Sequence, residues 1–159
     1  MKIEHGERGY ELPDEWWQSA GMHNFVPAMA AYHVDMSAWP GVSAVALPVG
    51  EIRPVERRGS RGVFNDSPEF GSARDRVLRI FAGFLGDHAI PPIEVLRVVG
   101  GQYTYELAAG VHRLYCAIAA GFTHVPAVDV TALHQGQDAG FDEFMMNRAA
   151  EQRDEADER

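Results

Sequence analysis

Hydrophobic and polar positions follow a helical period between residues 72 and 86. Ser72 and Asp75 have the spacing of a capping box, and Gly86 ends the pattern. Between them the apolar residues recur at i, i+3, i+4, i+7 and i+8, on one helical face. These residues are Val77, Ile80, Phe81, Phe84 and Leu85. The pattern predicts an amphipathic helix with one buried side.

Four shorter segments are typical of β-strands because they are rich in Val, Ile and alternating apolar residues. They span residues 43–48, 93–99, 103–108 and 124–130. In the second of them, Ile93 and Val95 point to the same face. Gly100-Gly101 predicts a tight turn, so the second and third strands form a hairpin.

The first part of the chain has less regular patterns. Pro13 in a first turn and Gly21 after the last turn predict a short helix over residues 10–20. Residues 22–42 predict an irregular arm lying on the core. We interpret the three tryptophans as anchors of this region on the main body: Trp16, Trp17 and Trp39.

Strands mixed with helices predict an α+β fold, a small mixed sheet with packed helices. Residues 53–71 predict a polar loop, and the tail from Phe141 to Arg159 predicts a helix with Phe141, Phe144 and Met145 on one side. The chain divides into an N-terminal helix and arm (1–42), a central domain (43–131) and a C-terminal helix with an acidic tail (132–159).

Composition and charge narrow the function. The chain has 159 residues, a formal net charge of −9 and one cysteine, Cys116, which we expect to be a buried, inert thiol. An acidic chain is a poor non-specific binder of nucleic acid, although arginines gather between Arg53 and Arg79. No apolar run approaches the roughly 18 residues of a membrane span, and the start lacks a signal-peptide pattern. We expect a cytoplasmic protein without a membrane partner.

The strongest chemical signal is Gly110-Val111-His112-Arg113, between a strand and a helix that ends at Gly121. A helix begins with unpaired N–H groups and a partial positive charge. Gly110 lets a ligand approach the backbone, Arg113 adds a fork of donors suited to phosphate, and His112 adds another donor. The four residues predict an anion site. The simpler interpretation is a glycine-capped turn with a surface arginine.

The order of these elements resembles the ParB N-terminal/sulfiredoxin superfamily over residues 47–130. Leu47 to Pro54 is similar to the family's opening strand and its exit. The helix at 72–86 followed by Ile90-Pro91-Pro92-Ile93-Glu94-Val95 is similar to its helix, Pro turn and second strand. Residues 105–114, which contain the Gly-x-His-Arg box, resemble its signature, and Gly121 to Ala127 resembles its closing segment.

The resemblance implies that Gly110, Val111, His112 and Arg113 bind nucleotide phosphates, with ATP, ADP or CTP as the nucleotide and Mg²⁺ as a further cofactor. Val111 stands where sulfiredoxin has its reactive cysteine, so sulfinic-acid reduction is not expected. The short stretch after Val130 cannot hold the DNA reader of partition proteins. The kinase-like members have a His-Arg box and an acidic loop residue, which here is Glu56 or, less well aligned, Asp66.

Two function classes stay open. The first is a nucleotide-dependent phosphotransferase or NTPase with Glu56 and His112 as catalytic residues. The second is a non-catalytic nucleotide-sensing or protein-interaction module, in which Glu56 is a loop charge paired with Arg57 or Arg58. A ParB-like nuclease ranks third. Glu106 is expected to be a sheet-surface residue. His33 and Asp35 are weak metal candidates, and self-association as a homodimer is open.

Overall fold

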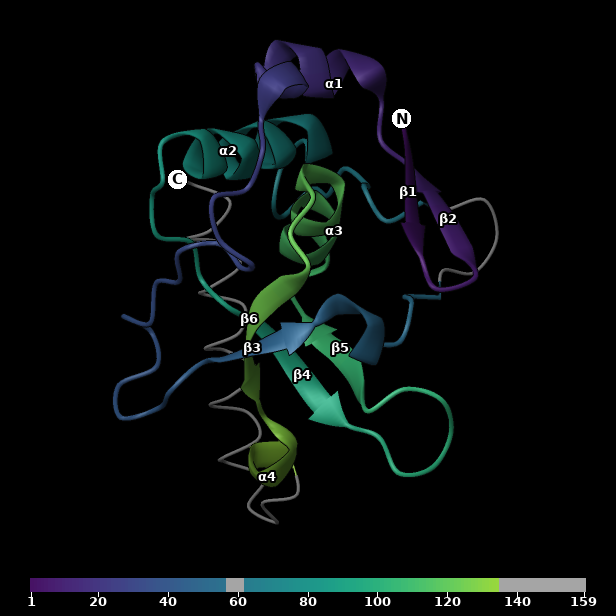
Figure 1. Cartoon of the computed structure of the whole chain (residues 1–159), viewed down its shortest axis with the longest axis vertical. Coiled ribbons are helices and arrows are strands. Elements are labelled where there is room, and N and C mark those ends of the chain that lie inside the picture. The colour runs from purple at the N-terminus through teal and green to yellow at the C-terminus, as the bar shows by residue number, and fades with distance from the viewer. Residues whose placement is uncertain (57–61, 135–159) are drawn as a thin grey trace.

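The computed structural model describes residues 1–56 and 62–134 (Figure 1). The strands in these ranges are β1 (Lys2–His5), β2 (Arg8–Glu11), β3 (Val45–Pro48), β4 (Ile93–Arg97), β5 (Tyr105–Ala109) and β6 (His124–Asp129). The helices are α1 (Asp14–Ser19), α2 (Ala73–Leu85), α3 (Val111–Ala120) and α4 (Thr131–His134), with 3₁₀ turns η1 (Met22–Asn24) and η2 (Val49–Glu51). The helix predicted from Phe141 to Arg159 lies outside the described residues.

The main sheet has four strands in the order β3-β6-β4-β5. β3 and β6 are antiparallel, with Val45 opposite Ala127, and β4 and β5 form the predicted antiparallel hairpin. β4 and β6 run parallel, with Ile93 also opposite Ala127, because the chain passes through β5 and α3 between them. This mixed sheet with its packed helices confirms the predicted α+β fold class.

Each face of the sheet has its own apolar cluster, since alternate side chains of a strand point to opposite faces. Ile93 and Val95 lie together in the larger cluster, as predicted, and pack with side chains of α2 and α3. Trp39 lies in the smaller cluster with Val128 and Val130 and is only 2% exposed. The N-terminal arm is therefore anchored to the sheet through a buried tryptophan, as expected from the sequence.

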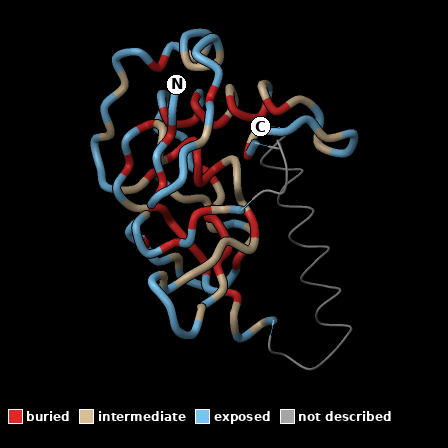
Figure 2. The backbone as a smooth tube through the Cα atoms, turned by 90° about the vertical axis from the view of Figure 1, so that its right-hand side faces the viewer, coloured by how far each residue is buried: buried red, intermediate tan, exposed pale blue. Residues whose placement is uncertain are grey.

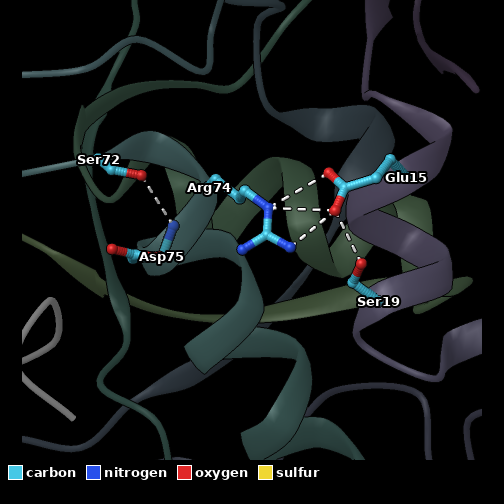
Figure 3. A network of polar contacts seen from close by, with 5 residues as sticks. All are labelled: Glu15, Ser19, Ser72, Arg74 and Asp75. Atoms are coloured by element: carbon cyan, nitrogen blue, oxygen red, sulfur yellow. Dashed lines mark hydrogen bonds and ion pairs between the residues drawn. The ribbon is translucent and has the colours of Figure 1, made fainter.

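Helix α2 begins and ends where the pattern predicts. The Ser72 hydroxyl accepts a hydrogen bond from the Asp75 backbone N–H at 3.2 Å, which caps the helix (Figure 3). Such a cap typically stabilises a protein by about 1 kcal/mol. Four of the five predicted apolar positions are buried, but Leu85 is 47% exposed. Leu85 is the last residue of α2, and its neighbour Phe84 is still in the core.

The prediction of a tight turn at Gly100-Gly101 is wrong. Arg97 pairs with Tyr105, and Val98 donates its N–H to the Thr104 carbonyl at 2.9 Å, so the loop is longer and has an odd number of residues. Both glycines do have positive φ, at 78° and 92°. They supply left-handed backbone inside a wider loop, visible below β4 and β5 in Figure 1.

The first eleven residues form a β-hairpin that the sequence patterns did not predict. His5 pairs with Arg8, which leaves Gly6-Glu7 as the turn, and Gly6 has φ of 60°. The short helix α1 follows, within the predicted range 10–20, and lies across α2 in Figure 1. Its exposed face is joined to α2 by Arg74, whose Nη2 donates to the Glu15 carboxylate at 2.7 Å (Figure 3).

Buried positions run through the interior along the strands and the two longer helices, and the peripheral loops are exposed (Figure 2). Trp16 and Trp17 are half-buried and pack against the larger cluster, as expected. In the part of the chain that the structure describes, no helix is both long enough and apolar enough to cross a bilayer.

Candidate functional site

The candidate site is a cavity of about 520 Å³ at the N-terminus of α3. Its walls come from four parts of the chain: the end of β5 and start of α3, one face of α2, the loop at 63–70, and the segment at 55–56. The polar lining residues are Glu56, Asn65, Asp66, Ser67, Arg76, His112 and Arg113. The structure therefore brings the Gly110–Arg113 motif and both candidate carboxylates, Glu56 and Asp66, to one cavity.

Gly110 forms the cap of α3, with φ of 99° and no side chain to bond the first helical N–H groups. A Cβ atom at this position would meet Ile93 Cγ2 at 3.0 Å and Arg113 Nη2 at 3.1 Å. Both the backbone conformation and the lack of space require glycine. The first turn of α3 thus opens toward the cavity without a side-chain cap.

Arg113 lies at the floor of the site and is 3% exposed. Its Nη1 donates a hydrogen bond to the Pro92 carbonyl at 2.7 Å, which ties α3 to the turn before β4. The simpler interpretation of a glycine-capped turn is correct for Gly110 but wrong for the surface arginine. The Arg113 guanidinium is instead buried beside Gly110, with the Pro92 carbonyl as its partner.

Tyr32 binds the same Pro91-Pro92 turn as Arg113. Its hydroxyl donates to the Pro91 carbonyl at 2.7 Å, next to the Pro92 carbonyl that Arg113 uses. Burial raises the pKa of this phenol, and the positive charge of Arg113 acts in the opposite direction. The Pro91-Pro92 turn is therefore held by two buried side chains, which fixes the guanidinium below the helix cap.

Arg76 is a cavity residue that sequence analysis missed. It is 5% exposed and donates through Nη2 to the Asn65 carbonyl, joining α2 to the loop at the mouth. A signal for it exists: Arg76 lies one turn before Ile80, on the apolar face of α2. Burying a charge on a helical face costs free energy unless the charge is paired or functional, so an arginine at this position indicates a site residue.

His112 is half-buried and lines the cavity from the first turn of α3. Its ring lies against Phe64, with 5.7 Å between ring centroids. Phe64 in turn contacts Trp16 edge-to-face at 6.2 Å. These ring contacts place the imidazole beside the loop that carries Phe64.

The two candidate carboxylates both have partners. Glu56 accepts a hydrogen bond from Arg8 Nη2 at 2.9 Å, and its side chain is 73% exposed. The partners considered from sequence, Arg57 and Arg58, lie outside the described residues. Asp66 Oδ1 accepts from the Ala73 N–H at 2.8 Å and so stabilises the N-terminus of α2. In this arrangement Asp66 has a capping role, and Glu56 forms an exposed ion pair with Arg8.

Other candidates lie away from the cavity. Glu106 pairs with Arg53 at 3.2 Å on the sheet surface, as expected. Asp35 accepts from the Ser37 N–H at 2.9 Å. Within residues 1–56 and 62–134, no group of three or more His, Cys, Asp or Glu side chains is arranged to hold a metal ion.

Cys116 is fully buried in α3, and burial raises the pKa of its thiol well above the ordinary value. A thiol held in its neutral form is a poor nucleophile. The predicted burial of the cysteine is confirmed, and its inertness stays a prediction.

No protein-family model, curated protein or solved structure matches this chain. The resemblance to the ParB N-terminal/sulfiredoxin superfamily therefore stays a prediction that rests on the motifs and their order. The cavity itself has an uncapped helix N-terminus and two buried arginines, Arg76 and Arg113, in its lining.

Proposed function

We propose that this protein binds a nucleotide or another small phosphorylated molecule in the cavity at the N-terminus of α3. The observation that supports this most directly is the glycine cap of α3, which opens into a cavity lined by Arg76 and Arg113. Helix N-termini attract anions through N–H groups and the helix dipole. Arginine adds a planar fork of donors that matches phosphate oxygens.

The size and lining of the cavity support a nucleotide as the ligand class. Small-molecule sites usually measure about 300 to 1,000 Å³, and this cavity, at about 520 Å³, falls in that range. Asn65 and Ser67 provide hydrogen-bonding groups near the mouth, and Phe70 provides an apolar ring. The phosphates would lie toward Gly110 and Arg113, and the base toward this loop.

Phosphoryl transfer or hydrolysis would need more than this cradle, because such reactions use a divalent ion and a carboxylate that positions the nucleophile. Glu56 is the candidate for that role in this proposal. Mg²⁺ usually binds through ligand phosphates and one or two carboxylates, so Glu56 or Asp66 would suffice beside a bound nucleotide. His112 would contribute a donor to the phosphates.

The alternative is a module that binds the nucleotide without catalysis. One observation favours it: both cavity carboxylates already have partners, Glu56 with Arg8 and Asp66 with the N-terminus of α2. Binding needs neither carboxylate, whereas catalysis needs at least one of them to reach the metal ion or the nucleophile as well. We therefore place binding first and treat catalysis as conditional on Glu56.

Isothermal titration calorimetry tests the binding proposal, with ATP, ADP, CTP and inorganic phosphate, each with and without Mg²⁺. We expect at least one nucleotide to bind the parent protein, and Arg113→Ala to weaken that binding by about tenfold or more, as for a lost charge-assisted hydrogen bond. Arg113→Lys keeps the positive charge, so it shows whether a loss of binding in Arg113→Ala comes from the missing donor group or from a disturbed fold. Arg53→Ala is the surface control. Failure of all four ligands to bind the parent would refute the proposal.

Catalysis is tested separately by release of phosphate from the bound nucleotide, measured for the parent and Glu56→Gln. Turnover that Glu56→Gln abolishes while binding persists would support the enzyme class. Binding without turnover in the parent would support the sensing module.

A further inference from the structure

The N-terminal hairpin β1–β2 contacts the wall of the cavity formed by Val55 and Glu56. Tyr10 and Arg8 of β2 each form a hydrogen bond to this wall, although their partners lie 45 and 48 residues further along the chain. The two residues hold different parts of it: Tyr10 bonds to the backbone of Val55, and Arg8 bonds to the side chain of Glu56. The hairpin thus meets the site although it does not line the cavity itself.

The Val55 backbone is held on both of its polar groups. The Tyr10 hydroxyl donates to the Val55 carbonyl at 2.7 Å, and the Val55 N–H donates to the Tyr115 hydroxyl oxygen at 2.9 Å. The two tyrosine rings pack together, with 4.4 Å between centroids. Tyr115 is fully buried in α3, so this wall is attached to the same helix whose N-terminus opens into the cavity.

His5 of β1 completes the connection between hairpin and wall. Its Nε2 lies 3.2 Å from the Val49 carbonyl, and its Nδ1 lies 3.0 Å from the Tyr115 hydroxyl. A carbonyl can only accept, so Nε2 carries the hydrogen and Nδ1 accepts from the Tyr115 hydroxyl. Tyr115 therefore donates to His5 while it accepts from Val55. This chain of hydrogen bonds connects β1 and α3 to the Val55 backbone and so orients the wall.

Arg8 has an electrostatic role on the same wall. The carboxylate of Glu56 lines a cavity whose proposed ligand is an anion, and an unneutralised carboxylate would repel that ligand. Arg8 Nη2 lies 2.9 Å from Glu56 Oε1, which neutralises the carboxylate. Both side chains are substantially exposed, at 49% and 73%, so salt will screen the effect.

We infer that Arg8 and Tyr10 are positioning residues of the ligand site: Tyr10 fixes the Val55 wall, and Arg8 holds and neutralises Glu56. This inference rests on the proposed function. It gives the N-terminal hairpin a part in ligand binding, although the hairpin lies outside the segment that carries the binding motif. It also predicts that the charge of Arg8 matters only while Glu56 is charged.

A double-mutant cycle tests the role of Arg8 by calorimetric titration of ATP into the parent, Arg8→Gln, Glu56→Gln and the double variant. Arg8→Gln should weaken ATP binding about threefold in low salt, the scale of an exposed ion pair. The loss should vanish at 0.5 M NaCl, which shortens the Debye length to about 4 Å. Glu56→Gln in the same chain should restore binding, and Arg8→Lys should retain it.

The matched control is Arg53→Gln, which removes an exposed partner of Glu106 at 3.2 Å outside the cavity lining. It should leave ATP affinity unchanged. Tyr10→Phe removes the hydrogen bond to Val55 without a charge, so its loss of affinity should persist in high salt. Melting temperatures of all variants identify any that lose the fold.

The outcomes separate this inference from the proposed function. If the parent binds none of ATP, ADP, CTP and inorganic phosphate, the proposed function fails and the inference fails with it. If the parent binds ATP and both Arg8→Gln and Tyr10→Phe bind it with parental affinity, only the inference is overturned. A lower melting temperature with unchanged affinity would likewise assign the hairpin a purely structural role.

Discussion

Replacing Gly110 by alanine tests whether backbone and ligand meet closely at the cap of α3. The helix offers its own control, because Gly110 and Gly121 flank α3 with nearly the same φ, 99° and 97°. An L-residue with left-handed backbone costs about 1–2 kcal/mol at either position. The two positions differ in the space around them: a Cβ at Gly121 would meet Pro27 at 3.6 Å, an ordinary contact, whereas one at Gly110 would meet Ile93 Cγ2 at 3.0 Å.

The added contact at Gly110 should cost about 1–3 kcal/mol more, the usual range for overpacking. We therefore expect Gly121→Ala to lower the free energy of unfolding by about 1–2 kcal/mol, and Gly110→Ala to lower it by about 2–5 kcal/mol. Urea unfolding followed by circular dichroism measures both. Because the Gly110 methyl would also press on the Arg113 guanidinium, Gly110→Ala should lose nucleotide affinity and Gly121→Ala should keep it. Equal losses of stability and affinity in the two variants would refute the close approach of Ile93 and of the ligand to Gly110.

Three further predictions concern stability and reactivity. Burial lowers the pKa of His5 below 6.5, so the unfolded chain takes up a proton before the folded protein does as the pH falls. The parent should therefore lose stability between pH 7 and 5, by up to about 1.4 kcal/mol per pH unit, and should lose more than His5→Gln. Parallel curves of stability against pH for the two proteins would contradict this. Ser72→Ala should destabilise α2 by about 1 kcal/mol in urea unfolding, and an unchanged midpoint would exclude the cap. Cys116 should react with Ellman's reagent only as fast as the protein unfolds; rapid labelling of the native protein would show that the thiol is accessible.

The middle of the chain could be predicted because several local signals agree there. In α2 the cap at Ser72, the apolar period and Gly86 all indicate the same helix, and the structure has it within a residue at each end. The start of α3 was equally clear, since Gly110 follows a strand and precedes an apolar period. Where the hydrophobic pattern and the capping residue indicate the same helix, tertiary contacts do not alter where that helix begins and ends.

The N-terminal hairpin was missed because its buried face includes a polar residue. In β1 the alternation is present, but the buried positions are Ile3 and His5, and a histidine counts as polar in a hydrophobic pattern. His5 is buried because Tyr115 and Val49 satisfy its nitrogens, and both lie far away in sequence. Arg76 was missed for a similar reason, since its partner Asn65 belongs to a loop without a regular pattern.

The candidate site was predictable in its residues but not in their partners. The motif at Gly110 to Arg113 and the loop residue Glu56 do line one cavity. The pairing of Glu56 with Arg8 depends on the hairpin, and the burial of Arg113 depends on the Pro92 carbonyl. Such long-range contacts decide which charges a ligand meets, and no local pattern specifies them.

The most direct test of the anion site is a titration of ¹⁵N-labelled protein with ATP, followed by two-dimensional NMR. The account predicts saturable shifts of the backbone amides of Val111 and His112, at the open N-terminus of α3, and of Ser67 at the mouth of the cavity. A second groove, of about 360 Å³, is lined by residues that include Val26 and Met29, and the amides there should not move. Shifts confined to that groove, or no saturable shift at Val111 and His112, would contradict the central claim.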